Sequence, residues 1–108
     1  MLINDDRLSR ALTKLAETDV LVAQLHAEVA RSEYRMKAVK DAIFLRSEGS
    51  VAERNAIAGT HPEYMAATEA YFIALQTHEA LRNERSREVI VVDVFRSLNS
   101  ARTKGLIQ

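Results

Sequence analysis

The chain has 108 residues, with 15 Lys or Arg against 15 Asp or Glu and no Cys. This length suits a single domain, the balanced charge gives no net attraction to nucleic acid or a membrane surface, and the lack of Cys excludes disulfides and thiolate metal sites. Only three Gly and one Pro are present, so turn-forming residues are scarce and we expect an all-α fold.

Residues 5–47 contain neither Gly nor Pro and predict one long helix. Along it, apolar or small residues return at spacings that alternate between three and four, which is typical of a coiled coil. We call this set the seam: Leu8, Ala11, Leu15, Thr18, Val22, Leu25, Val29, Ser32, Met36, Val39 and Ile43. A helix of roughly 64 Å cannot bury such a stripe alone, so it must lie against another long helix.

The ends of the predicted elements carry recognisable capping signals. Asn4 or Asp5 can cap the first helix, and Gly49 suits the left-handed position after its end. Ser50 and Glu53 have capping-box spacing, which predicts a short helix over 51–58 that ends at Gly59. The same spacing from Thr60 to Glu63, with Pro62 in the first turn, predicts a helix over 62–102.

Residues 88–95 are ambiguous because five of them are β-branched, a composition that favours a strand. We still predict a helix there. The chain offers no second strand to satisfy the backbone of a first one. In addition, Val91, Phe95 and Leu98 recur at helical spacing.

Together these elements predict a single helical domain over 1–108, built as a long antiparallel hairpin with a short corner helix. Charge supports the antiparallel direction, because the basic segment 31–46 would face the acidic segment 62–79. Toward the open end the signs reverse, so that acidic residues of the first helix, such as Asp5 and Asp19, would face the basic residues of the segment 82–104. Apolar residues also lie off the seam, which predicts homo-oligomerisation into a helical bundle. The expected oligomer or partner interface comprises Leu8, Leu12, Leu15, Val22, Leu25, Val29, Met36, Tyr71, Phe72, Leu75, Val91 and Phe95.

No catalytic or metal motif stands out in the sequence. His26, His61 and His78 lack the Glu-x-x-His or His-x-x-x-His spacing of a helical metal site. The carboxylates have basic neighbours three or four residues away, such as Glu33 with Lys37, which are ordinary helix-surface pairs. We therefore expect no enzyme activity, no cofactor and no small-molecule substrate.

A basic set in the last third of the chain is the main candidate for nucleic-acid contact. It mixes Arg and Lys with polar residues that commonly contact phosphate and sugar. The set comprises Arg82, Arg85, Arg87, Arg96, Asn99, Arg102 and Lys104. The competing interpretation is that the cations stabilise a helix C-terminus, with Gly105 as a C-cap.

The segment Val94–Gly105 resembles the end of small helical proteins of tailed bacteriophages, in which an aromatic-Arg-Ser-Leu-Asn-x-x-Arg run precedes Gly. This resemblance implies a phage or prophage accessory protein that acts on a host factor or in DNA metabolism. The short acidic N-terminus and the lack of an apolar run of ~20 residues predict a cytoplasmic protein without a membrane span. Our first hypothesis is a non-enzymatic protein that acts through helix faces on a protein partner. The alternative is a DNA-binding accessory protein of recombination or replication.

Overall fold

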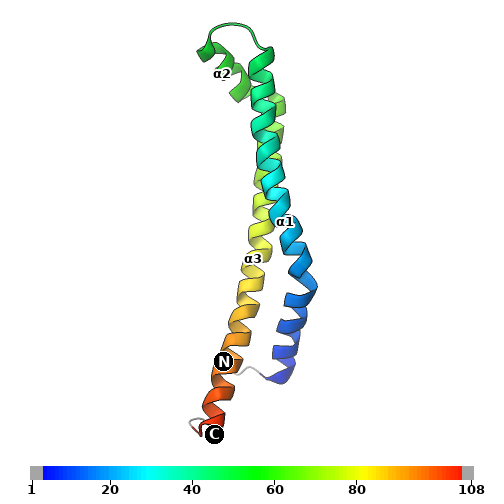
Figure 1. Ribbon diagram of the computed structural model, residues 1–108, viewed down its shortest axis with the longest axis vertical. Helices are drawn as coiled ribbons and strands as arrows, with labels where there is room; N and C mark the ends of the chain where they lie inside the picture. The colour runs from blue at the N-terminus through cyan, green and yellow to red at the C-terminus, as the bar shows by residue number, and fades with distance from the viewer. Residues whose placement is uncertain (1–3, 106–108) are drawn as a thin grey trace. The chain divides into compact units, whose positions relative to one another are not determined.

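The computed structural model describes residues 4–105, and these residues form three helices (Figure 1). Helix α1 spans Asp5–Arg46, α2 spans Val51–Thr60 and α3 spans Pro62–Thr103. The two long helices pack against each other as a hairpin and α2 is the short corner helix, so the predicted fold is confirmed. Residues 88–95 are helical throughout, which rejects the strand alternative.

The chain divides into two compact units. The terminal unit contains the chain up to Ala23 and from Ala80 onward, and the corner unit contains Gln24–Glu79. In each unit a segment of α1 packs against a segment of α3, and α2 belongs to the corner unit. We describe each unit by itself.

The predicted seam is confirmed at every position. Ala11, Ser32 and Ile43 are buried, and the other eight seam residues are partly buried. The terminal unit has a core of Ala11, Val91 and Val92, against which Leu8, Leu15, Val94 and Phe95 pack. In the corner unit Ile43 is 1% exposed and Ala58 is 0% exposed. Because two helices enclose few positions completely, large side chains on the outer faces stay in contact with solvent.

The predicted start and end of α1 and the start of α2 are confirmed in detail. Asn4 Oδ1 accepts a 2.8 Å hydrogen bond from the Arg7 backbone N–H. Gly49 has φ +115°, a conformation that favours glycine. Ser50 Oγ accepts a 3.1 Å hydrogen bond from the Glu53 N–H and donates a 3.0 Å bond to the Glu53 carboxylate. Ser50 therefore caps α2 as predicted, and the Glu53 carboxylate accepts from the Ser50 hydroxyl where a full capping box has it accept from the backbone N–H.

The predicted junction between α2 and α3 is wrong in two respects. Gly59 does not end α2, which continues to Thr60. Thr60 does not cap α3 either, because its hydroxyl donates to the Ala56 carbonyl at 2.8 Å. The cap is His61, whose extended backbone breaks the helix and whose Nδ1 accepts a 3.1 Å hydrogen bond from the Glu63 N–H. An imidazole nitrogen thus replaces the hydroxyl that the Thr-x-x-Glu spacing led us to expect.

Candidate interaction surfaces

Most of the predicted interface residues face the inside of the hairpin. Only Leu12 and Phe72 are exposed, at 49% and 53%. Val91 is buried, and the remaining residues are partly buried: Leu8, Leu15, Val22, Leu25, Val29, Met36, Tyr71, Leu75 and Phe95. These residues pack within the chain, so a partner would have to use the side chains that the seam leaves outside.

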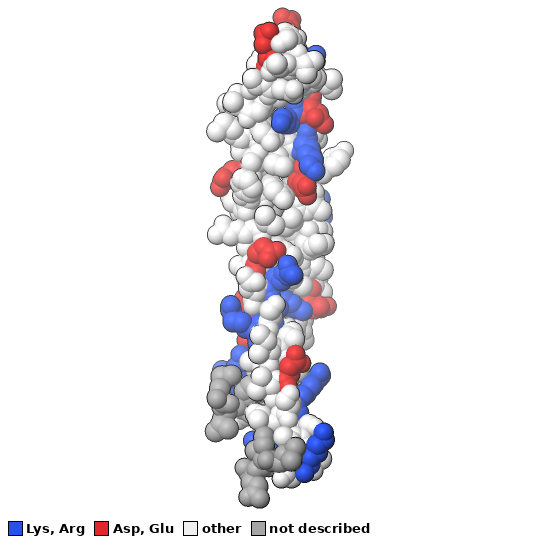
Figure 2. All heavy atoms as spheres, turned by 90° about the vertical axis from the view of Figure 1, so that its left-hand side faces the viewer, with Lys and Arg blue, Asp and Glu red and all other residues white. Residues whose placement is uncertain are grey.

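Several large apolar side chains lie outside the seam. In the terminal unit they are Leu12, Val20, Leu21, Val89 and Ile90, all at least 45% exposed. In the corner unit they are Tyr34, Leu45, Val51, Ile57, Met65, Phe72 and Ile73, all at least 44% exposed. Figure 2 shows one face on which wide areas carry no charged side chain. Where exposed apolar side chains adjoin one another, they commonly mark an interaction site.

One exposed apolar region of the terminal unit forms a groove along α3, which we call the α3 groove. Its lining surface is predominantly apolar, and Val89 and Ile90 are the exposed apolar residues in it. The lining residues are Val22, Arg82, Arg85, Ser86, Val89 and Ile90. Two residues of the predicted basic set, Arg82 and Arg85, therefore border an apolar surface.

Arg85 contributes to the hairpin itself. Its Nη1 donates a 2.8 Å hydrogen bond to the Leu15 carbonyl and a 2.6 Å bond to Thr18 Oγ1 across the terminal unit. Its Nη2 lies 3.5 Å from the Asp19 carboxylate, and the side chain is 20% exposed. The guanidinium is thus committed to contacts with α1, which leaves little of it for phosphate.

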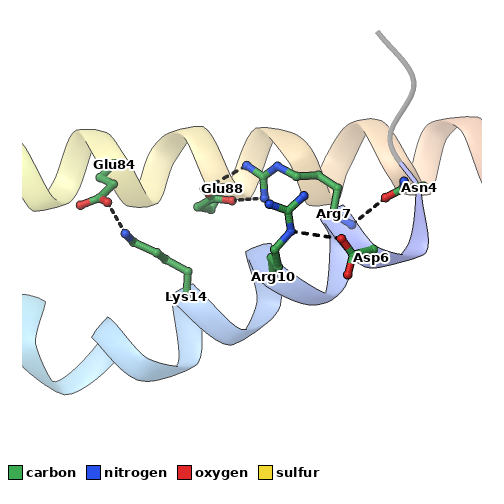
Figure 3. A network of polar contacts seen from close by, with 7 residues as sticks. All are labelled: Asn4, Asp6, Arg7, Arg10, Lys14, Glu84 and Glu88. Carbon is green, nitrogen blue, oxygen red and sulfur yellow. Dashed lines mark hydrogen bonds and ion pairs between the residues drawn. The ribbon is translucent and has the colours of Figure 1, made fainter.

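Two further ion pairs join α1 to α3 in the terminal unit (Figure 3). Arg7 Nη2 donates a 3.0 Å hydrogen bond to Glu88 Oε1. Arg7 Nη1 lies 2.8 Å from Oε2 as an ion-pair contact without hydrogen-bond alignment, so the buried Oε2 has no hydrogen bond. Lys14 pairs with Glu84. In both pairs the cation is on α1, the reverse of the polarity that overall segment charge predicted for this end.

The environment of Glu88 favours its charged form. The hydrogen bond from Arg7 is the largest influence and lowers the pKa of the Glu88 carboxyl, burial opposes it, and the charges of Arg7, Lys14 and Arg87 lower it further. The same contact raises the pKa of Arg7. This pair therefore holds the helices together without supplying a group that exchanges protons near neutral pH.

The structure divides the remaining predicted basic residues between different faces of α3. Arg96 and Lys104 line a shallow hollow with Ser97, Ser100 and Ala101. Asn99, Arg102 and Arg87 are exposed but do not line it. At 3.6 residues per turn, Arg102 lies about 120° around the helix from Arg96. Figure 2 shows Lys and Arg side chains at the end where the last turns of α3 lie.

The corner unit contains polar clusters that sequence spacing identified only in part. Arg35 and Arg31 bind the Glu28 carboxylate at 2.6 Å and 3.1 Å, and Ser32 Oγ donates to it at 3.2 Å. Hydrogen bonds from Arg35, Arg31 and Ser32, in that order, lower the pKa of Glu28. The Glu33–Lys37 pair is confirmed at 3.0 Å.

Contacts between sequence-distant residues of the corner unit were missed by sequence reasoning. The rings of His26 and His78 lie 5.4 Å apart, between α1 and α3. Arg46 pairs with Glu63 at 3.1 Å, in the predicted basic-to-acidic direction. The Arg54 guanidinium lies 4.2 Å from the centre of the Phe44 ring, and its Nε donates a 3.0 Å hydrogen bond to the Phe44 backbone carbonyl. A residue-by-residue register of the hairpin would have been needed to find these contacts.

Comparison with known proteins adds no relative to this description: no protein-family model, curated protein or solved structure matches the chain. Within residues 4–105, no group of three or more His, Asp or Glu side chains is arranged to hold a metal ion. No helix in this described part of the chain has the length and apolar character of a membrane span.

Proposed function

We propose that this chain is a non-enzymatic interaction protein of the phage-accessory type, which binds a protein partner through exposed apolar faces of its long helices. The observation that carries the proposal is the exposure of Tyr34, Leu45 and Met65 at 75%, 74% and 60%. Phe72 and Ile73 add two further apolar side chains on the same unit. Burying such side chains against a complementary surface contributes favourable free energy at about 25 cal/mol per Å² of apolar area.

The titratable groups also support a non-enzymatic role. Among the described residues, the pKa values of Arg7, Glu28, Lys37 and Glu88 are shifted, and each shift favours the charged form of the group. A general acid or base works best with a pKa near the working pH, which requires a shift in the opposite direction. These side chains act as ion-pair partners within the fold.

The proposal is tested by site-specific photo-crosslinking in bacterial cytoplasm. A benzophenone amino acid in place of Phe72 or Tyr34 should crosslink to a discrete protein, whereas the same group in place of the exposed, polar Glu69 should not. The crosslinked protein, once purified, should bind the chain directly, and Phe72→Lys should weaken that binding at least tenfold while leaving helical circular dichroism unchanged. Equal crosslinking from Glu69 and the apolar positions would contradict the proposal.

A second candidate function, nucleic-acid binding, is favoured by the hollow at the end of α3. Arg96 and Lys104 lie there beside two Ser hydroxyls, and the described chain after Asp93 contains no acidic residue. Anisotropy of labelled single- and double-stranded DNA tests it. Binding that falls steeply with salt and is lost in Arg96→Ala/Lys104→Ala, but kept in Arg102→Ala, would support this function. Absence of binding at low salt would reject it.

A further inference from the structure

The α3 groove exposes apolar side chains that a second helix could cover. Val89 and Ile90 are 45% and 58% exposed beside it, although the next two residues, Val91 and Val92, are only 7% exposed. The same helix therefore buries one apolar face in the terminal unit and presents a second one to solvent. Ser86, one turn before Ile90, is a small residue on the groove and leaves room for a side chain from outside.

The residues along this face are spaced symmetrically. Arg82, Ser86, Val89 and Asp93 follow one another at intervals of four, three and four residues. This spacing reads the same in both directions along the helix. Two identical helices that cross antiparallel about a two-fold axis would place Val89 of each copy opposite Ser86 of the other. A two-fold interface requires this kind of self-complementary surface.

The charged residues at the two ends of this face, Arg82 and Asp93, are also related by the two-fold axis. In the antiparallel arrangement Arg82 of one copy meets Asp93 of the other, and the contact occurs twice. Arg82 and Asp93 are eleven residues apart, about 16 Å along one helix, so within one chain they cannot pair with each other. Both side chains are exposed. Each apolar centre is thus flanked by opposite charges in the positions that a second copy would match.

We propose that the α3 groove is the site at which a second copy of this chain binds, antiparallel along α3, to form a four-helix bundle. The inference rests on the proposed function, since both use exposed helix faces.

Sedimentation velocity over a range of protein concentrations tests the site. The wild type should be a dimer that dissociates on dilution. Ile90→Lys should raise the dissociation constant at least tenfold, because it places a charge in the groove that the second copy would cover. Val20→Lys is the matched control, since Val20 is 66% exposed in the same unit and lies outside the groove. A monomeric wild type, or equal loss of dimer in both variants, would overturn the inference.

Charge exchange tests the orientation. Arg82→Glu alone and Asp93→Arg alone should each weaken the dimer several-fold, because like charges then meet twice across the two-fold axis. The double variant should recover dissociation close to that of the wild type, and only contact between copies can produce this recovery. Absence of recovery, in variants that keep wild-type helical content, would overturn the antiparallel register. Photo-crosslinking from Phe72 tests the proposed function independently of the dimer. A chain that sediments as a monomer but still crosslinks to a partner protein would reject this inference and support the proposed function.

Discussion

Replacing Ile43 by Ala should destabilise the corner unit more than any other single truncation of an apolar side chain in α1. Ile43 is 1% exposed and is the largest fully buried side chain among the described residues. The change removes three carbons, worth about 0.8 kcal/mol each on transfer from water, or about 2.4 kcal/mol. Incomplete collapse of the cavity adds to this figure, so we expect a loss of about 3 kcal/mol.

The matched control is Leu45→Ala, two residues along the same helix, where the side chain is 74% exposed. It should change the free energy of unfolding by no more than about 0.5 kcal/mol. Urea unfolding followed by circular dichroism measures both variants, and thermal unfolding should show Tm lower by roughly 12–15 °C for Ile43→Ala. A loss below about 1 kcal/mol at Ile43, or a loss at Leu45 equal to that at Ile43, would refute the assigned pattern of burial.

Three further predictions concern polar contacts and the corner. Because the folded pKa of Glu88 is lowered, its pairing with Arg7 contributes stability above the usual carboxyl value of 4.5. That stability is lost as the pH falls through the lowered pKa of the folded state. In Glu88→Gln the free energy of unfolding should therefore fall less steeply at acidic pH than in the wild type, and an unchanged pH dependence would contradict this. Arg85→Met should cost about 2 kcal/mol in urea unfolding through its lost charged hydrogen bonds, whereas Arg87→Met, an exposed control, should cost almost nothing. Gly49→Ala should lower stability by about 1–2 kcal/mol because φ is +115° and the new Cβ would lie 2.9 Å from a carboxylate oxygen; a stability gain would show that the turn can relax.

Sequence periodicity was sufficient to predict the hairpin and the inward face of α1. The alternation of three and four residues specifies which side of a long helix is apolar, so Leu8 through Ile43 could be assigned before the structure was known. The helical state of 88–95 was predicted by a different argument, the lack of a second strand. β-Branched propensity alone would have given the wrong answer there, since packing outweighs propensity within a long helix.

The candidate surfaces could be predicted only in part, because periodicity gives the face of a helix without the register between helices. Net segment charge correctly predicted the direction of the Arg46–Glu63 pair in the corner unit and of the Arg85–Asp19 pair in the terminal unit, although not the pairs themselves. The same argument predicted the wrong sign of charge on α1 for the pairs of Arg7 and Lys14, because their partners depend on which turns of α3 lie opposite. The cap of α3 was predicted wrongly for a related reason. Thr60 and His61 both offer a capping atom, and the backbone path decides which one is used.

The buried positions of the seam also predict how the protein tolerates sequence change. Ala11 and Ser32 are 0% and 3% exposed, so at these turns no space remains for a larger side chain. In a complete substitution library, position 11 should accept little beyond Gly, Ala and Ser, while Leu8 and Leu15, which are partly buried, should accept Ile and Met. Variation in the chain should therefore be most restricted at its smallest inward-facing residues, since these determine how closely the two long helices approach.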